Sequence, residues 1–413
     1  MPETAVAADQ HEGSALAVLV ASLGLGCTAF GGPIAHLGHF ERAYVERRRW
    51  LASEEYAAIV ALCQLLPGPT SSQVGFLVGW HRAGWRGAIA AWIGFTLPSA
   101  ALMYGLARLE AQVQGPIVGA VLHGLKLVAV AFVAQALWNM ARNLCPDLRR
   151  AGIAILVALG LLTVGGSAMQ LVALAASAVA GWMLCGAAGL TSPQRSVHIS
   201  AAIAVFALVV FVALLLVLSV AAARLPHSPY ALADIFYRSG ALVFGGGHVV
   251  LPLLRDALVP SGWMSDATFL NGYGAAQALP GPLFCVAAFL GAASAPAGSA
   301  SALWAALALF GVFLPGMLLA VAGFWLWREA LRLPAIGAVL AGVNAGVVGV
   351  LAAAFCNPVW SASVHSPVDA LIGLGGWILL ARARLAPLIV VAACIGASVG
   401  WALCCVSPAA AWG

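Results

Sequence analysis

Two prolines around a glycine occur twice in this chain, each time after a glutamine and an apolar pair. The first copy is Gln64–Pro69, and the second is Gln277–Pro282, 213 positions later. Proline cannot donate a helix hydrogen bond, and glycine permits backbone angles that other residues avoid. In apolar sequence these residues interrupt helices. Because a helix N-terminus carries about half a positive charge, interrupted helices favour the binding of an anion.

A second pair of glycine-rich stretches lies upstream of these breaks. Phe30–Pro33 precedes the first break and Phe244–Gly247 precedes the second, 214 positions apart. Glycine permits close approach of the backbone to a ligand. Thr70 and Ser71 follow the first break and supply hydroxyls that either cap the next helix or donate to a ligand. The alternative is that all four stretches are kinks that serve packing alone.

Lys126 is the only lysine, and it lies about ten residues into the apolar stretch 116–141. A cation at that depth is costly, which makes Lys126 a candidate for ligand binding. Snorkelling to the surface or a structural ion pair are the alternatives. Its counterpart in the second copy is Asn344.

Histidines and glutamines adjoin the breaks. His36 and His248 are either ligands or hydrogen-bonded packing residues. Gln64 and Gln277 either donate amides to an oxyanion or tie the broken backbone together. The predicted substrate-binding residues are Phe30, Gly31, Gly32, His36, Gln64, Pro67, Gly68, Pro69, Thr70, Ser71, Lys126, Phe244, Gly245, Gly246, His248, Gln277, Pro280, Gly281, Pro282 and Asn344.

Acidic residues stand near the ends of the apolar stretches or in loops, and none lies in the middle of one. This argues against a buried-carboxylate proton relay and against a cation carrier, which usually require intramembrane acids. We find no convincing intramembrane protease motif and no haem, flavin or iron–sulfur motif. The sequence therefore predicts no enzyme, no cofactor and no metal site.

The composition predicts the elements that must position these residues. The chain of 413 residues is 63% hydrophobic and 8% charged, with a mean hydropathy of +1.00. Apolar stretches long enough to cross a bilayer recur, for example 87–107, 116–137, 201–222 and 333–355. The chain is thus predicted to be an all-α polytopic membrane protein with the lipid bilayer as its surroundings. The net charge of +5 does not indicate nucleic-acid binding, because basic residues cluster at the ends of membrane segments.

The paired motifs predict two repeats joined by an extra transmembrane span. The predicted divisions are a polar tail at 1–13, a first transporter repeat at 14–187, a linker with the extra span at 188–229, a second repeat at 230–406 and a tail at 407–413. One extra span between similar units places them in opposite orientations. With the N-terminus cytoplasmic and the C-terminus periplasmic, 14 of the arginines fall on the cytoplasmic side and 4 outside.

These motifs in combination resemble the bacterial chromate ion transporter family in its long, two-domain form. The resemblance is carried by Phe30–His36, by Phe244–Pro252 and by the two Gln-x-Leu-Pro-Gly-Pro stretches, and it extends over nearly the whole chain. It implies an inverted-repeat protein of the bacterial inner membrane that exports chromate and confers resistance, with sulfate as a close competitor and a homodimer left open. The second unit has Leu283–Cys285 where the first has Thr70–Ser72, so the two half-sites are not equivalent.

Two other functions remain open. A sulfate or oxyanion permease, or an anion channel of the same fold, would use the same anion-binding features. A membrane reductase of chromate would require electron-carrying cofactors, for which the sequence shows no motif.

Overall fold

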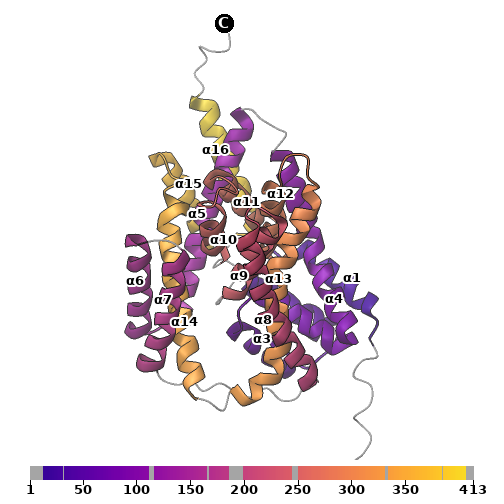
Figure 1. The fold of residues 1–413 in the computed structure, drawn as a ribbon. Helices are drawn as coiled ribbons and strands as arrows, with labels where there is room; N and C mark the ends of the chain where they lie inside the picture. The colour runs from indigo at the N-terminus through magenta and orange to yellow at the C-terminus, as the bar shows by residue number, and fades with distance from the viewer. Residues whose placement is uncertain are drawn as a thin grey trace, which may run out of the picture.

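The computed structural model describes residues 13–30, 32–110, 116–164, 167–185, 199–243, 250–330, 334–383 and 385–405. Within these ranges all regular structure is helical, which confirms the prediction of an all-α protein (Figure 1). The helices before residue 200 are α1 (Ala15–Thr28), α2 (Gly32–Phe40), a π-helical turn (Glu41–Arg47), α3 (Ser53–Leu65), α4 (Thr70–Glu110), α5 (Pro116–Leu144), α6 (Leu148–Thr163) and α7 (Ser167–Leu184).

The helices after residue 200 begin with the predicted extra span. They are α8 (Ala201–Arg224), α9 (Pro229–Leu242), α10 (Val250–Leu258), α11 (Asp266–Ala278), a 3-10 turn (Leu283–Cys285), α12 (Val286–Ala293), α13 (Ser301–Ala330), α14 (Pro334–Ala354), a π-helical turn (Phe355–Trp360), α15 (Pro367–Ala381) and α16 (Pro387–Cys405).

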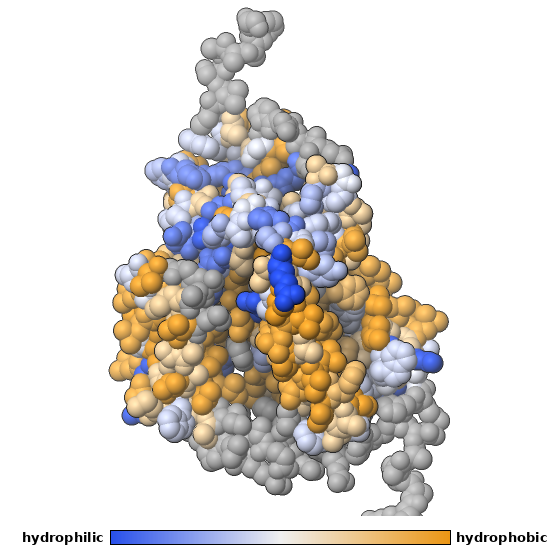
Figure 2. Space-filling model, viewed as in Figure 1, coloured by the Kyte–Doolittle hydropathy of each residue, from blue (hydrophilic) through white to orange (hydrophobic). Residues whose placement is uncertain are grey.

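Several helices have the length and composition of membrane spans. Among the described residues, six qualify by both criteria. They are Thr70–Glu110, Ile117–Leu144, Ala201–Arg224, Ser301–Trp325, Gly337–Trp360 and Pro387–Cys404. Large apolar side chains are exposed along α8, for example Phe206 and Val217. Figure 2 shows apolar side chains over the middle and lower part of this face, as expected for a surface in lipid.

The helices end at the proline- and glycine-rich stretches, as the sequence predicts. After α1 the backbone is extended at Ala29, and α2 begins at Gly32 with φ of 79°. After α3 the chain is extended at Leu66 and reaches a φ of 123° at Gly68. After α11 it is extended at Leu279 and reaches a φ of 92° at Gly281. Only glycine adopts such positive φ angles without strain, so these positions end the helices inside the protein.

A further break divides α4. Ala83 and Gly84 have non-helical backbone angles, and Gly84 has a φ of 59°. The part of α4 before this kink is a short helix, and only the part after it is long enough to cross a bilayer. The sequence predicts the same division, with a short segment at 70–80 and a span at 87–107.

Helices from the two halves of the chain interlock. Helix α5 packs against α15 and α16, and helix α14 packs against α6 and α7. In Figure 1 α6, α7 and α14 stand together at the left of the view. Helices α5 and α14 occupy equivalent places in the two copies. Each of them therefore packs against the last two helices of the other half.

Two main groups of buried apolar side chains hold the breaks in place. One surrounds the first break and includes Phe40, Tyr44 and Ile59, which are almost fully buried. The other is larger, draws on helices of both halves and includes Phe269 and Phe284. The interrupted segments are therefore embedded in packed protein, where irregular backbone is tolerated at membrane depth.

Candidate functional site

The breaks of the two halves meet and exchange backbone hydrogen bonds. The N–H of Gly68 donates to the carbonyl of Val243 at 2.7 Å, and the N–H of Gly281 donates to the carbonyl of Ala29 at 2.8 Å. Gly68 corresponds to Gly281 in the duplication, and Ala29 corresponds to Val243. Equivalent hydrogen bonds are thus made twice, once with the donor in the first half and once with the donor in the second. Both glycine amides are occupied in this conformation, so neither is free to contact a ligand.

Close packing accompanies each bond. A β-carbon at Gly68 would lie 2.7 Å from Cα of Gly316, and one at Gly281 would lie 2.8 Å from Oγ of Ser99. The hydroxyl of Ser99 donates to the carbonyl of Pro280. Gly316 and Ser99 are again counterparts, because each follows a Leu-Pro pair. The glycines are required here for close approach as well as for their backbone angles.

A small cavity lies where the breaks meet. It has a volume of about 20 Å³ and is lined by Gly32, Phe132, Ala276, Gln277, Leu279, Gly281 and Leu283. Nε2 of Gln277 is buried there, without a hydrogen-bond partner among the residues that the structure describes. A space of this size holds a single water molecule. The site is therefore closed in this conformation, and a tetrahedral oxyanion would enter only after the helices around it move apart.

Buried polar side chains gather beside the first break. Nδ1 of His36 lies 3.3 Å from Oγ of Ser71, and the imidazole also lies near the carbonyl of Ala29. Within the described part of the chain, Nε2 of His36, Oγ of Ser72 and Oγ1 of Thr96 are buried without a hydrogen-bond partner. Such groups are rare in folded proteins, because each loses its bonds to water, and they are suited to hydrogen-bond a polar ligand.

Gln73 ties this break to the other half. Its Nε2 donates to the carbonyl of Pro67 at 2.9 Å and to the carbonyl of Gly316 at 2.8 Å. Its Oε1 is buried without a partner. Ser72, Gln73, Thr96 and Ser99 are absent from the residues predicted above. The sequence offered one signal that could have found them. They are polar residues in apolar surroundings, either directly after the first break or on both sides of the Leu97–Pro98 pair.

The charge of Glu110, at the end of α4, acts on Lys126 of α5. Oε1 of Glu110 accepts a hydrogen bond of 2.6 Å from Nδ2 of Asn271 on α11. Both charged side chains are half-buried.

The predicted residues are only partly brought together. Gly32, Gln277 and Gly281 line the central cavity, and Gly68 meets Val243 beside Gly316. Thr70 begins α4 and is buried, as is Pro69 before it. Phe30, Pro67 and Pro280 are half-buried in the breaks, and Pro282 is buried.

Further predicted residues, Gln64 and Asn344 among them, do not line the cavity. Gln64 is exposed on α3, and Asn344 is half-buried on α14. Five lie outside the described residues. They are Gly31, Phe244, Gly245, Gly246 and His248.

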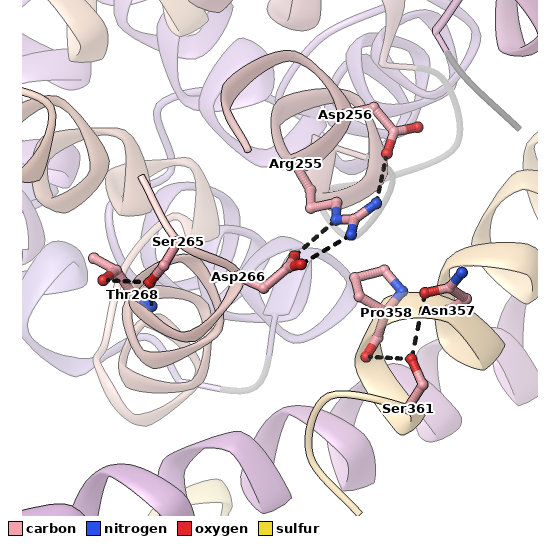
Figure 3. A network of polar contacts seen from close by, with 8 residues as sticks. All are labelled: Arg255, Asp256, Ser265, Asp266, Thr268, Asn357, Pro358 and Ser361. Carbon is pink, nitrogen blue, oxygen red and sulfur yellow. Dashed lines mark hydrogen bonds and ion pairs between the residues drawn. The ribbon is translucent and has the colours of Figure 1, made fainter. Parts of the chain in front are cut away.

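A larger cavity of about 100 Å³ lies beside α10 and the end of α14. Arg255 projects there and forms a two-pronged ion pair with Asp266, at 2.9 and 3.0 Å, and a contact of 3.3 Å with Asp256 (Figure 3). Burial raises the pKa of Asp256 above its ordinary value, although the guanidinium opposes this. Two carboxylates against one guanidinium disfavour a dianion, so the breaks remain the better anion site.

Comparison with known proteins decides the family. A profile described as chromate transporter matches residues 16–182 and 230–401. The chain belongs to the chromate transporter family. It is therefore a multi-pass membrane transporter, and the resemblance drawn from the paired motifs is confirmed.

Members of the chromate transporter family from several bacteria are similar to this chain. A chromate transport protein of Pseudomonas aeruginosa is 29% identical over 80% of this chain and 78% of its own length. A probable chromate transport protein of Synechococcus elongatus is 28% identical over 92% of this chain and 94% of its own. A chromate transport protein of Cupriavidus metallidurans is 25% identical over 80% and 79%. No solved structure matches the chain.

Proposed function

We propose that this protein is a secondary transporter that exports chromate across the bacterial inner membrane and so confers chromate resistance, with sulfate as a competing substrate. Membership of the chromate transporter family supports chromate as the substrate. The crossed hydrogen bonds of Gly68 and Gly281 are the observation that supports a carrier. They join two interrupted segments at one closed site, and discontinuous helices that meet between repeats are typical of alternating-access transporters.

The two repeats have opposite orientations in this proposal. The contacts of Gly68 with the second half are repeated by Gly281 with the first half. This repetition supports a two-fold relation between the repeats. In Figure 1 the helices around the first breaks, such as α3, lie in the lower part, whereas α10, α11 and α12 lie in the upper part. The segments matched by the family profile also fall within the proposed repeats at 14–187 and 230–406.

The orientation in the membrane follows from the basic residues. Arginines are concentrated on one side of the proposed topology, which makes that side cytoplasmic by the positive-inside rule. The N-terminus is then cytoplasmic and the C-terminus periplasmic. A positively charged inner face also attracts a dianion to the side from which it is exported.

Neutral donors around the first break suit a tetrahedral oxyanion. His36, Ser72 and Thr96 each have a buried polar atom without a partner among the described residues, and the first turn of α4 adds the positive end of a helix dipole. The second half has Phe284 and Cys285 at the places of Ser71 and Ser72 and forms a 3-10 turn there. The first repeat therefore supplies most of the polar contacts to the anion.

The membrane potential is sufficient to drive export. A dianion that leaves a cell held at about −100 mV gains about 4.6 kcal/mol, because each charge contributes about 2.3 kcal/mol. At about 1.4 kcal/mol per decade this supports an outward gradient above about a thousandfold. Export of chromate then needs no coupled ion, whereas import would need one.

Purified protein in liposomes tests this function. We expect chromate to accumulate on the positive side of an imposed potassium diffusion potential, and sulfate to compete with it. Everted vesicles should lose chromate uptake when the potential is clamped to zero without other ion gradients. Uptake that persists under that clamp would exclude potential-driven export.

The same preparation separates the remaining alternatives. A carrier shows counterflow, in which unlabelled chromate inside accelerates entry of labelled chromate, whereas a channel shows single-channel current steps. A sulfate permease would transport sulfate without measurable chromate flux. A reductase would lower the amount of hexavalent chromium, which a transporter only relocates.

A further inference from the structure

Two arginines from separate segments of the first half converge on one tryptophan. Cζ of Arg48 lies 5.7 Å from the centre of the Trp50 ring, and Cζ of Arg82 lies 5.8 Å from it. Arg48 follows the π-helical turn, and Arg82 directly precedes the kink of α4. Neither guanidinium group forms an ion pair with a carboxylate in the part of the chain that the structure describes. Two positive charges thus meet at one ring with no described carboxylate to balance them.

The indole ring of Trp50 is held in place by packing. Its backbone N–H donates to the carbonyl of Tyr44 at 2.8 Å, which folds the chain back so that the two rings stack with planes 15° apart. Tyr44 is 1% exposed, and its hydroxyl lies 3.0 Å from Oγ of Ser22 on α1. The side chain of Arg82 lies against Gly13, where a β-carbon would be 2.6 Å from its Cγ. Packed protein therefore positions both arginines.

The pair of arginines stands where a lipid-facing surface ends. Trp50 packs against the start of α1 and the start of the long part of α4. The surface of these helices is apolar, since Leu16 of α1 is 66% exposed and Ile89 of α4 is 42% exposed. Trp85 is exposed as well, and Cζ of Arg86 lies 5.5 Å from its ring. Tryptophan and arginine beside an apolar surface mark the level of the lipid head groups.

The figures show the same surface. Helices α1 and α4 stand at the right of the view in Figure 1, and in Figure 2 the apolar surface there borders hydrophilic side chains. The acyl chains of a bound lipid would lie along this apolar surface while its head group reached the arginines.

We propose that Arg48 and Arg82 form a binding site for the phosphate group of an anionic phospholipid such as phosphatidylglycerol. A guanidinium group donates two parallel hydrogen bonds to phosphate oxygens, which suits this ligand. An anionic lipid balances the two cations, whereas a zwitterionic lipid brings its own positive charge. The proposed topology places this site on the cytoplasmic side, where anionic lipids attract basic segments. The inference does not depend on which anion is transported.

The site joins segments on either side of the first break. Arg48 precedes α3 and the Pro67–Pro69 stretch, and Arg82 follows them. One head group bound to both arginines would fix the distance between the π-helical turn and the kink of α4. An anionic lipid should therefore stabilise the protein as well as bind to it.

The experiment measures lipid binding to the full-length protein. Native mass spectrometry from micelles with equal amounts of phosphatidylglycerol and phosphatidylcholine gives the preference between them, and the thermal midpoint with either lipid gives the stabilisation. We expect the wild type to prefer phosphatidylglycerol. Arg48→Gln and Arg82→Gln should each lower its affinity about fivefold, and the double variant should lower it further. Arg48→Lys should lose less, because lysine keeps the charge without the forked contact.

Arg382→Gln is the matched control. Arg382 ends α15, is exposed and lies on the same side of the proposed topology, so this variant removes an equal charge and should keep the preference. An equal loss in the control would overturn the site, because any surface arginine would then serve. A lower midpoint with an unchanged lipid preference in the Arg48 and Arg82 variants would also overturn it, since the arginines would then act only in packing.

Soluble anions are the last comparison. Inorganic phosphate and chromate are added to the wild type in place of the lipid, and neither should reproduce its stabilisation. If either stabilises the protein as strongly as phosphatidylglycerol and depends on the same two arginines, the site belongs to a soluble anion and the assignment to a lipid fails. Absence of chromate transport would contradict the proposed function and leave this result unchanged.

Discussion

At the scale of single residues, Gln73 holds the first break to the other half of the molecule. Its side chain is fully buried, and its amide donates to two backbone carbonyls, those of Pro67 and Gly316. The counterpart of Gln73 in the second half is Val286, which has no such donor. This contact therefore belongs to one repeat and makes the two breaks chemically different.

We expect Gln73→Leu to destabilise the protein and to abolish transport. The change leaves two buried carbonyls without this donor, and each unmade bond costs about 1–3 kcal/mol. The measurement is the thermal unfolding midpoint in detergent together with chromate flux. Gln64→Leu is the control, because Gln64 is exposed on α3 and should change the midpoint little. Equal effects of the two changes would contradict the assigned role of Gln73.

At the scale of helices, glycine allows the interlocked pairs to approach closely. Gly342 of α14 lies against Ser177 and Gly181 of α7, and Gly124 of α5 lies against Ile395 and Ser398 of α16. The hydroxyl of Ser398 donates to the carbonyl of Ala120 across the second contact at 2.8 Å. Small residues of this kind are the usual means by which membrane helices associate, since lipid offers no hydrophobic driving force.

We expect Gly342→Ala to weaken the contact between α14 and α7. An added methyl group there would collide with backbone atoms of Ser177 and Gly181, and overpacking of this kind costs about 1–3 kcal/mol. Gly400→Ala is the matched control, because no atom lies within 4 Å of a β-carbon at that position. The yield of monodisperse protein and its thermal midpoint should fall for the first variant only. A loss of similar size in the control would indicate a general intolerance of α-carbon substitution.

At the scale of the whole molecule, the interlocked helices make the two repeats a single unit. Helix α5 packs with α15 and α16, and α14 packs with α6 and α7. Each repeat therefore lacks part of its own packing when the other is absent. The moving body in the proposed transport cycle is then not one repeat as a whole but the broken segments around the crossed bonds.

We expect the linker after α7 and the C-terminus to lie on opposite sides of the membrane. Fusions of green fluorescent protein and of alkaline phosphatase report this, since the first fluoresces inside the cell and the second is active in the periplasm. A fusion within the linker at 188–198 should fluoresce, and one after residue 405 should show phosphatase activity. Two fusions that report the same side would contradict the inverted arrangement of the repeats.

The sequence by itself determined the class of the protein, the family and the places where helices break. Hydropathy records burial in lipid along each segment, and proline and glycine act on the backbone locally, so both can be read without knowledge of contacts. The twin motifs at Gln64 and Gln277 likewise marked the segments that meet. The segments that meet at the candidate site were thus predictable from the sequence pattern, although many of the residues there were not.

Only the tertiary structure decided which hydrogen-bond donors are used and which groups accept from them. The amides of Gly68 and Gly281 bond across the halves, Gln64 is exposed, and Gln73 donates to the carbonyl of Gly316. Each of these facts depends on a contact between segments that are far apart in the chain, or on which face of a helix meets its neighbour. Local residue patterns do not encode such contacts, because the sequence of one helix does not specify which of its faces packs against which neighbour.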